Sequence, residues 1–511
     1  MNVKKRAAAR VGLCLLAMLL LVSCLAGCGP KKGKTADGTA TGGETVTKAP
    51  ESTAIKDDLP DVDMDGFEFV VLNYTDAGHG YSYKTVVLEA GEIADGDVVG
   101  EKIYSRNMKI EDRFKCLISE HQEDQPNVRL KNAVMENSNE YHIALMYEED
   151  RINDVLVNGA IRLFDEIPYI DLSRPYWNDS AADAYSYKGY VYAGVGDWCL
   201  SMYSKLHAYL VNKQVYNSVP QEEDLYDLVR NKEWTLEKMF EIAQRYDRIA
   251  DGAPESNQYG LIGTSKVHYQ LLLTGAGLKY VNNTEEGYAF ALGDPNNTPM
   301  LDNILRLSSQ YFYKNTPGYN DGIVTDEFVQ GRAMMMAGMI ITLDAVRGEV
   351  QNVGVLPAPL YNEEQDDYHT ISVGGLVTCF PLTLSDADLN NAGIIAEALC
   401  CESYNSVIPE YKEVLLKSRR TDSPDDAEMM DVLFRTMSFD LGCSTWGYQI
   451  RLNLMSNVFN YACNNTASPA VGPIPPYASV FATLNLEEDF QKTMDGVIAR
   501  VWKMNGDGAA S

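Results

Sequence analysis

The sequence lacks the short motifs that mark common catalytic and nucleotide-binding sites. It contains no Gly-x-Ser-x-Gly nucleophile elbow, no phosphate-binding loop and no His-Glu-x-x-His pair among its six histidines. Paired carboxylates are uninformative here, because 72 acidic residues supply such pairs by chance. We therefore expect a protein that is not an enzyme and that holds no cofactor or metal.

Basic residues are also scarce. The chain has 43 basic and 72 acidic residues, for a formal net charge of −29. The first 27 residues hold four of the basic residues and none of the acidic ones, which leaves −33 for the rest. A charge of this size repels phosphate, so it argues against nucleic acid and against direct adhesion to anionic lipid.

Long apolar runs and cysteine motifs are missing beyond residue 28. No later segment approaches the ~20 apolar residues that a membrane-spanning helix needs. The cysteines after Cys28 are odd in number and form no CxxC pair: Cys116, Cys199, Cys379, Cys400, Cys401, Cys443 and Cys463. We expect these cysteines to be buried free thiols, and the sequence is also compatible with one disulfide bond among them.

The N-terminus has the pattern of an export signal. Lys4, Lys5, Arg6 and Arg10 precede an apolar stretch that is too short for a good membrane span. It ends in Leu-Ala-Gly-Cys at Cys28, which resembles the lipobox of bacterial lipoproteins. The resemblance implies that residues 1–27 are a signal peptide and that Cys28 carries lipid. It also implies an extracytoplasmic protein that contacts the membrane only through this anchor.

A flexible tether and a large folded body follow. Residues 28–60 are rich in Gly, Thr, Lys, Ala and Asp, so we expect them to be disordered. The roughly 450 residues that remain exceed what one hydrophobic core usually serves, so at least two lobes are expected.

Strand-like and helix-like segments alternate along this body. The strands are predicted at residues 66–72, 141–147, 333–336, 354–356 and 371–380. The helices are predicted at Gly100–Phe114, with Ile103, Ile110 and Phe114 on one side, and at Trp234–Tyr246, with a long apolar face. The region after residue 385 reads as mostly helical. The alternation predicts an α/β fold with largely parallel sheets.

Several segments, in order, resemble the extracellular solute-binding proteins that include the maltose-binding type. They are Tyr187–Ala193, Leu210–Tyr216, Trp234–Glu237, Phe328–Met336, Val353–Pro359 and Ser372–Gly375. Ile170–Trp177, Gly196-Asp197 and Tyr411–Lys417 are similar to a subgroup common in anaerobic Firmicutes, which favours a Gram-positive cell surface over a periplasmic membrane. One departure is Met339 after Gly338, where many relatives place a Trp, so a maltose-like ligand is in doubt.

The resemblance implies a two-lobed periplasmic-binding-protein-like fold with a hinge and an interlobe cleft. The lobes are discontinuous: residues 61–196 and 371–420 form lobe 1, and residues 200–368 and 425–507 form lobe 2. We expect the chain to cross between them near Gly194–Ser201, His369–Gly375 and Ser418–Pro424. Solute would favour the closed form, which would dock on a transporter.

The candidate ligand-binding residues follow from strand ends and crossings. Sugars bind to aromatic platforms edged by hydrogen-bonding side chains, and open α/β sheets bind ligands at the carboxyl ends of their strands. The candidates are Asn73 and Tyr74 after the first strand, Tyr147, Asp150 and Arg151 after the second, Asp197 and Trp198 at the first crossing, and Trp446 and Tyr448 in a late segment.

These features together predict a monomeric, lipid-anchored solute-binding protein of an ABC importer. Its partners would be a small-molecule solute, most simply a sugar or oligosaccharide, and the permease subunits. Three alternatives stay open: a binding protein for peptides or other small polar solutes, a sensor or scavenger that serves no importer, and a lipid-anchored hydrolase acting on glycans. The absence of a catalytic motif weighs against the hydrolase. The sequence does not identify the solute.

Overall fold

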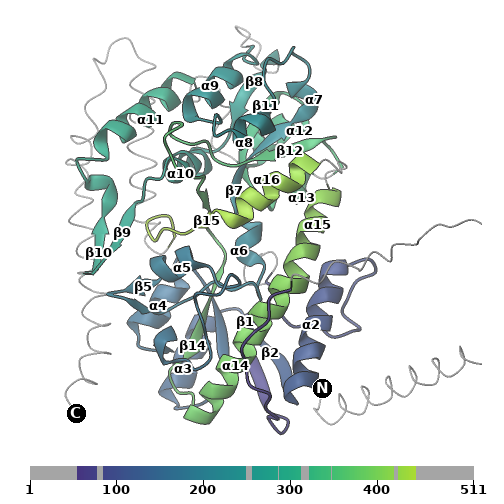
Figure 1. The fold of residues 1–511 in the computed structure, drawn as a ribbon, viewed down its shortest axis with the longest axis vertical. Coiled ribbons are helices and arrows are strands. Elements are labelled where there is room, and N and C mark those ends of the chain that lie inside the picture. Colours follow the sequence, from purple (N-terminus) through teal and green to yellow (C-terminus); the bar gives the residue numbers. More distant parts are fainter. Residues whose placement is uncertain are drawn as a thin grey trace, which may run out of the picture. The chain divides into compact units, whose positions relative to one another are not determined.

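The computed structural model (Figure 1) describes residues 54–76, 84–248, 256–285, 287–311, 321–346, 348–418 and 424–444. The predicted signal segment and Cys28, the predicted site of lipid attachment, lie outside these residues. The described chain begins before the predicted end of the tether, since Ile55 donates its amide hydrogen to Asn405 Oδ1 at 3.0 Å and Asp57 pairs with Arg113 at 2.7 Å. Among the described helices, none is long and apolar enough to cross a membrane.

One five-stranded sheet forms the centre of the first lobe. Its strands lie in the order β2 (Leu117–Glu123), β1 (Glu68–Tyr74), β3 (Ile143–Tyr147), β14 (Leu376–Pro381) and β4 (Ile161–Arg162). β1 is parallel to both neighbours, whereas β14 is antiparallel to β3 and to β4. The helices that follow these strands are α2 (Val98–Phe114), α3 (Pro126–Met135), α4 (Arg151–Val157) and α14 (Asp386–Glu402).

The strand β1 is apolar on both faces because helices cover both. Phe69 and Val71 share a buried cluster with Phe114 of α2, while Leu72 belongs to the cluster that contains Leu130 of α3. A strand with two covered faces reads as a nearly continuous apolar run, which is why the sequence identifies it. α2 matches the predicted helix, and its start is set by Asp97, whose side chain accepts a hydrogen bond from the Gly100 amide.

A second sheet of four strands forms the centre of the other lobe. Its order is β12 (Val353–Leu356), β7 (His207–Asn212), β11 (Ala333–Met339) and β8 (Tyr259–Ile262). β11 and β8 are parallel, but β7 is antiparallel to both β11 and β12. Both sheets are therefore mixed, and the prediction of largely parallel sheets is wrong. The α/β class itself is confirmed.

Helices of the second lobe pack on this sheet and on one another. They are α7 (Lys213–Tyr216), α8 (Leu225–Arg230), α9 (Leu236–Gln244), α10 (Ser265–Gly275), α11 (Thr298–Tyr311), α12 (Asp321–Val329), α13 (Thr342–Val346) and α16 (Pro424–Arg435). α9 is the amphipathic helix that the sequence predicts, shortened because Thr235 caps its start by accepting from the Lys238 amide. α16 joins this lobe through an ion pair between Lys213 and the fully buried Asp426 at 3.0 Å.

The predicted strand 371–380 is broken in two. β13 (Thr370–Ile371) pairs with β15 (Met437–Ser438), and β14 starts only at Leu376. Between them Gly374 adopts φ +96°, a conformation that residues with side chains rarely take. The break lets the chain pass from the two-stranded β13–β15 sheet into the five-stranded sheet that contains β14. The sequence does not reveal this break, because residues 371–380 form a nearly continuous apolar run.

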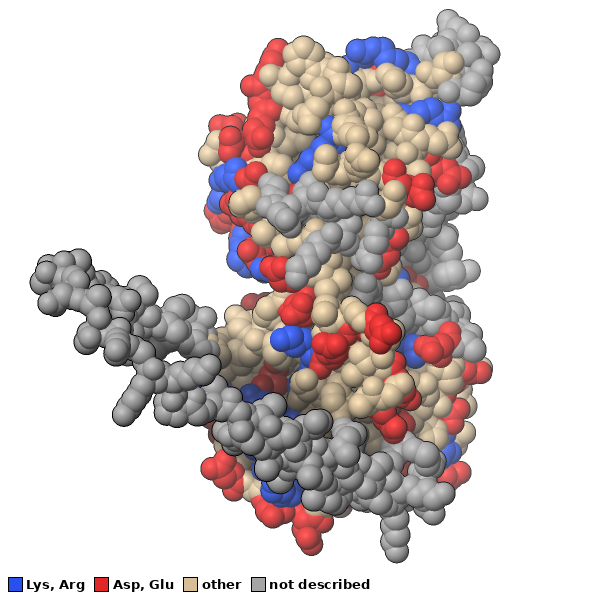
Figure 2. All heavy atoms as spheres, turned by 90° about the vertical axis from the view of Figure 1, so that its right-hand side faces the viewer, with Lys and Arg blue, Asp and Glu red and all other residues tan. Residues whose placement is uncertain are grey.

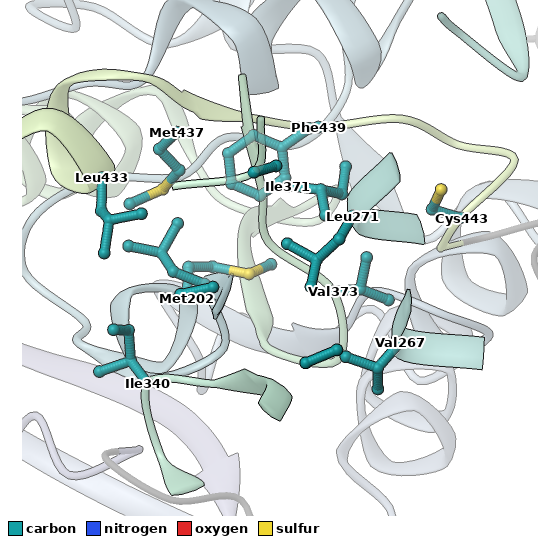
Figure 3. Packing of buried hydrophobic residues seen from close by; sticks show 14 of the residues in the cluster. Met202, Val267, Leu271, Ile340, Ile371, Val373, Leu433, Met437, Phe439 and Cys443 are labelled. Carbon is teal, nitrogen blue, oxygen red and sulfur yellow. The ribbon is translucent and has the colours of Figure 1, made fainter. Parts of the chain in front are cut away.

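Apolar side chains of the first two crossings belong to one large buried cluster that also includes residues of α10, α16 and the segment after β11, and Figure 3 shows part of it. We call the residues labelled there the crossing cluster: Met202, Val267, Leu271, Ile340, Ile371, Val373, Leu433, Met437, Phe439 and Cys443. Met202 lies on α6 (Ser201–Ser204), directly before β7, and Val267 and Leu271 lie on α10. The cluster gives the crossings a common core.

Connecting elements complete the described chain. They are α5 (Asp179–Ala184), the hairpin β5 (Ser186–Tyr187) and β6 (Tyr190–Val191), the hairpin β9 (Val281–Thr284) and β10 (Gly287–Phe290), a π-helix at Ser403–Val407, and α15 (Ile408–Ser418). α15 contacts α2, α13 and α16, so it touches helices of both lobes. Trp177 is buried and donates its indole hydrogen to Glu397 Oε2 at 2.7 Å, which anchors its loop to α14.

All six cysteines in the described residues are free and buried: Cys116, Cys199, Cys379, Cys400, Cys401 and Cys443. Burial raises the pKa of Cys116 to about 12 and that of Cys401 to about 11, since an apolar environment disfavours the thiolate. These thiols therefore act as small apolar side chains.

Acidic side chains are dispersed over the surface. Figure 2 shows Asp and Glu spread across one face of the molecule with Lys and Arg between them, in keeping with the net charge of −29. On that face the described residues form no continuous basic patch.

Trp234 offers a test of the second lobe. Its side chain is fully buried, and Nε1 donates to the Pro357 carbonyl oxygen at 3.0 Å. We expect Trp234→Ala to lower the free energy of unfolding by about 3–5 kcal/mol in urea denaturation followed by circular dichroism. Met135→Ala, at a side chain that is 78% exposed, should stay within about 0.5 kcal/mol of the parent. Equal effects of the two changes would contradict the packing described here.

Candidate functional site

The carboxyl end of β3 is joined to the crossing segment between β13 and β14. Glu148, which follows the strand, accepts hydrogen bonds at Oε1 from the backbone amides of Gly374 and, at 3.3 Å, of Gly375. Its other oxygen accepts from the Tyr185 hydroxyl, and the Glu148 amide donates to the Gly375 carbonyl at 3.2 Å. The strand end and the crossing therefore form one hydrogen-bonded unit.

The carboxyl end of β11 reaches the same crossing through α6. Ile341 donates its amide hydrogen to the Ser204 carbonyl at 2.8 Å. The Ser372 hydroxyl donates to the Met202 carbonyl at 2.7 Å, so α6 lies against both the β11 end and the second crossing. A methyl group at Gly375 would meet the Met202 sulfur at 2.5 Å, which shows how close the two segments lie.

Strand ends from both sheets thus converge on the crossings. We call this region the strand-end junction and define it as Tyr147–Arg151, Met202–Lys205, Met339–Ile341 and Gly374–Gly375. Open α/β sheets bind their ligands outside the carboxyl ends of strands, where the connecting loops leave room for side chains. The junction is therefore the candidate functional site.

The predicted residues of the first strand are buried inside lobe 1. Asn73 donates from Nδ2 to the Lys84 carbonyl at 2.9 Å and to Glu120 at 2.6 Å, and its Oδ1 accepts from the Tyr74 amide. Tyr74 is 1% exposed, and its hydroxyl accepts from the Tyr147 amide at 3.1 Å. Tyr74 thus contacts the junction, whereas the bonds of Asn73 stay within lobe 1, and contact of either side chain with solute stays a prediction.

The predicted residues of the first crossing are also buried. The Trp198 indole donates to the Thr378 hydroxyl at 2.9 Å, and its carbonyl accepts from the Arg106 guanidinium at 2.9 Å. Asp197 accepts from the Tyr203 hydroxyl at 2.6 Å. These bonds fix the crossing to lobe 1, and a direct role in binding is untested.

Three predicted residues lie at the surface of the junction. Tyr147 is half-buried, and its hydroxyl lies 3.8 Å from the position of a methyl group built at Gly374. Asp150 is exposed and lies 3.5 Å from the Arg151 guanidinium. Tyr147 and Arg151 could thus contact a ligand without rearrangement of the core. Trp446 and Tyr448 lie outside the described residues.

Buried carboxylates lie at the first and second crossings, and a third, Asp440, follows β15. Burial raises the pKa of Glu148 to about 7, although hydrogen bonds from Tyr185 and Gly374 oppose the change. Burial likewise raises the pKa of Asp197 to about 7, although a hydrogen bond from Tyr203 opposes the change. It also raises the pKa of Asp440 to about 7, against hydrogen bonds from backbone amides, of which that of Tyr280 is the strongest. These three acids therefore change charge near neutral pH.

Sequence reasoning missed Glu148, Met202 and Lys205. Glu148 is the first residue of Glu-Glu-Asp after a predicted strand, so its position at a strand end was a usable signal. Met202 and Lys205 follow the first crossing in a segment with no motif. Only the folded chain brings them to the ends of β3 and β11.

A separate pocket of about 460 Å³ lies between α5 and the turn after α10. Its lining includes Asp179, Asp183, Lys279, His369 and Phe439. An ion pair between Lys279 and Asp183 at 3.2 Å lies at this pocket. None of the predicted residues that the structure describes lines it. In the described part of the chain, no group of three or more His, Cys, Asp or Glu side chains could hold a metal ion.

The fold resembles that of solved carbohydrate-binding proteins. A cyclo/maltodextrin-binding protein in complex with maltotetraose matches with a TM-score of 0.55 and 12% identity, covering 83% of this chain and 97% of that one. The maltose/maltodextrin-binding domain of Bdellovibrio bacteriovorus bound to maltotriose matches with a TM-score of 0.46 and 13% identity, covering 83% of this chain and 100% of that one.

The first of these matches confirms the two-lobed fold of the maltose-type solute-binding proteins for this chain. At 12% identity it establishes the fold and not the ligand. No protein-family model matches the sequence, and no curated protein sequence matches it either.

Glu148 should make stability depend on pH. Its folded pKa of about 7 exceeds the ordinary 4.5, so the folded state binds more protons between these values. The stabilisation is complete below about pH 4.5 and is lost as pH rises through 7, by up to ~1.4 kcal/mol per pH unit. Because glutamine stays neutral, Glu148→Gln should become more stable relative to the parent over this range in urea titrations.

The matched control is Glu136→Gln, at an exposed residue. Its free energy of unfolding should run parallel to that of the parent from pH 4.5 to 8. If the Glu148→Gln profile were also parallel, Glu148 would titrate normally and the assignment would fail.

Proposed function

We propose that this chain is the solute-binding lipoprotein of an ABC importer, and that it captures a carbohydrate at the strand-end junction. The observation that carries the proposal is the convergence of β3 and β11 on shared crossing segments. Lobe 1 supplies Tyr147 and Arg151 on one side, and lobe 2 supplies the residues after β11 on the other. A solute that contacts both sides would favour one arrangement of the lobes.

The crossings suit a hinge in this proposal. Hinges are a few element-terminal residues that absorb large changes in backbone angles. Gly374 already has φ +96°, and the two-residue strand β13 precedes it. The crossing cluster would act as the fixed core about which the lobes turn.

Aromatic and planar polar groups at the junction suit a sugar. The Tyr147 ring offers an apolar face, and the Arg151 guanidinium offers several donors in one plane. The fold similarity to a maltodextrin-binding protein supports a carbohydrate, and the absence of a Trp after Gly338 argues against maltose itself. A peptide or another small polar solute, and a sensor role, are the alternatives that experiments must separate.

Ligand screening tests the solute class directly. We expect one class of mono- or oligosaccharide to raise the unfolding temperature of the full chain in detergent, followed by intrinsic fluorescence. A ligand at 100 times its Kd adds about 2.7 kcal/mol to stability, which is readily measured. Stabilisation by short peptides and by no sugar would overturn the carbohydrate assignment.

Tyr147 tests the site. Tyr147→Ala should weaken binding of the stabilising sugar about 10-fold, or ~1.4 kcal/mol, because a stacking face is lost. Tyr190→Ala is the control, since Tyr190 is 47% exposed on the β5–β6 hairpin. Equal affinities for the two variants in calorimetric titration would place the solute elsewhere.

Cys28 tests the anchor. In cells fed an alkyne-bearing fatty acid, the chain should become labelled and sediment with membranes. Cys28→Ala should abolish the label and shift the chain out of the membrane fraction, because attached acyl chains bind bilayers through their buried CH₂ groups. Membrane retention of Cys28→Ala would contradict a lipoprotein.

A further inference from the structure

Lys205 occupies a fixed place within the strand-end junction. It lies between α6 and β7, where the chain enters the second lobe. Its neighbours Ser204 and Leu206 accept backbone hydrogen bonds from Ile341 at 2.8 Å and Ile340 at 2.9 Å. The backbone on both sides of Lys205 is therefore held against the end of β11.

The Lys205 side chain is more accessible than those of its two neighbours. Ser204 and Leu206 are buried, whereas Lys205 is half-buried. Its ammonium group makes no hydrogen bond or ion pair with any residue that the structure describes. Glu149, on the loop after β3, acts on it electrostatically without forming an ion pair. Lys205 is thus close enough to the loop after β3 for the charge of Glu149 to act on it.

Most other half-buried lysines in the described chain have carboxylate partners, and Lys188 instead lies over the Tyr187 ring, 5.6 Å from its centroid. Lys131 pairs with Asp154 at 2.7 Å, and Lys213 pairs with Asp426 at 3.0 Å. In a protein with 72 acidic residues such pairing is easily achieved. Lys205 is therefore unusual in a position where water is partly excluded.

An unpaired, partly desolvated cation is unfavourable for the empty protein. Burial lowers the pKa of Lys205, and the nearby charge of Glu149 opposes the change. Such residues are retained at binding sites, where a ligand supplies the missing partner. The partner that fits an ammonium group is an anion.

We propose that the solute carries an acidic group and that Lys205 binds it. This inference rests on the proposed function, because it assigns the solute class of the same site. An acidic sugar, with a carboxylate, phosphate or sulfate, combines the required anion with faces that suit Tyr147. Arg151 is a second cation on the lobe-1 side of the junction.

Paired ligands test the charge requirement. Calorimetric titration of the full chain in detergent would compare trigalacturonate, glucose 6-phosphate and a sulfated disaccharide with maltotriose and galactose. We expect at least one acidic sugar to bind, and the neutral sugars to bind at least 10-fold more weakly. The arm that responds distinguishes carboxylate, phosphate and sulfate.

Variants of Lys205 and of Glu149 should change the affinity for the acidic sugar in opposite directions. Lys205→Met should weaken binding of the acidic sugar about 10- to 100-fold, the range for a lost charge-assisted hydrogen bond. Lys205→Arg should restore most of the affinity. Glu149→Gln should strengthen binding, because it removes a repelling charge. Lys56→Met, at an exposed residue, should leave the affinity unchanged.

The outcomes separate this inference from the proposed function. Binding of neutral sugars with an affinity unchanged in Lys205→Met would overturn the acidic solute and leave a carbohydrate-binding protein. Acidic sugars that bind equally well to the parent and to Lys205→Met would also overturn it. If no sugar of either kind bound, both the inference and the carbohydrate assignment would fall.

Discussion

The structure depends on how the buried carboxyl group of Glu148 holds the second crossing. It accepts hydrogen bonds from two consecutive backbone amides, Gly374 and Gly375, where the chain passes from β13 to β14. The crossing cluster packs close by, with Met202 against Gly375. A hydrogen-bonded turn next to an apolar core can change its backbone angles locally while each lobe keeps its own sheet. The lobes also contact one another away from this crossing, since Lys279 pairs with Asp183 at 3.2 Å and Asn283 Nδ2 donates to the Ser186 hydroxyl at 2.6 Å.

Much of the fold could be predicted because its signals are local. β1 is apolar on both faces, and α9 has an apolar stripe with a capping Thr235, so each is recognised from its own residues. Strand direction could not be predicted in this way. β7 runs antiparallel to its neighbours, and this depends on where α6 delivers the chain rather than on the sequence of the strand. The break at Gly374 was likewise hidden inside an apolar run.

The candidate site was predicted in part, and the limits are physical. Strand-end reasoning found Tyr147 and Arg151, which are accessible, but it also selected Asn73, which is buried and bonded to Glu120. A position at a strand end places a residue near the edge of the sheet, but it does not show whether the polar atoms of its side chain already have hydrogen-bond partners within the protein. Lys205 was missed because the reason to single it out is that its ammonium group has no carboxylate partner in the described residues. The sequence does not show which side chains surround it, so only the folded structure reveals this.

The buried thiols have a practical consequence for observing the lobes. A buried thiol with a raised pKa reacts slowly with maleimides, since the thiolate is the reactive species. Five of the six described cysteines have a raised pKa and the sixth, Cys443, is buried, so all six can remain while the other four, Cys14, Cys24, Cys28 and Cys463, are replaced by serine. New cysteines at exposed Met135 in the first lobe and Glu237 in the second would then accept a fluorophore pair selectively. Single-molecule energy transfer between them would report lobe rotation in a chain whose native thiols stay silent.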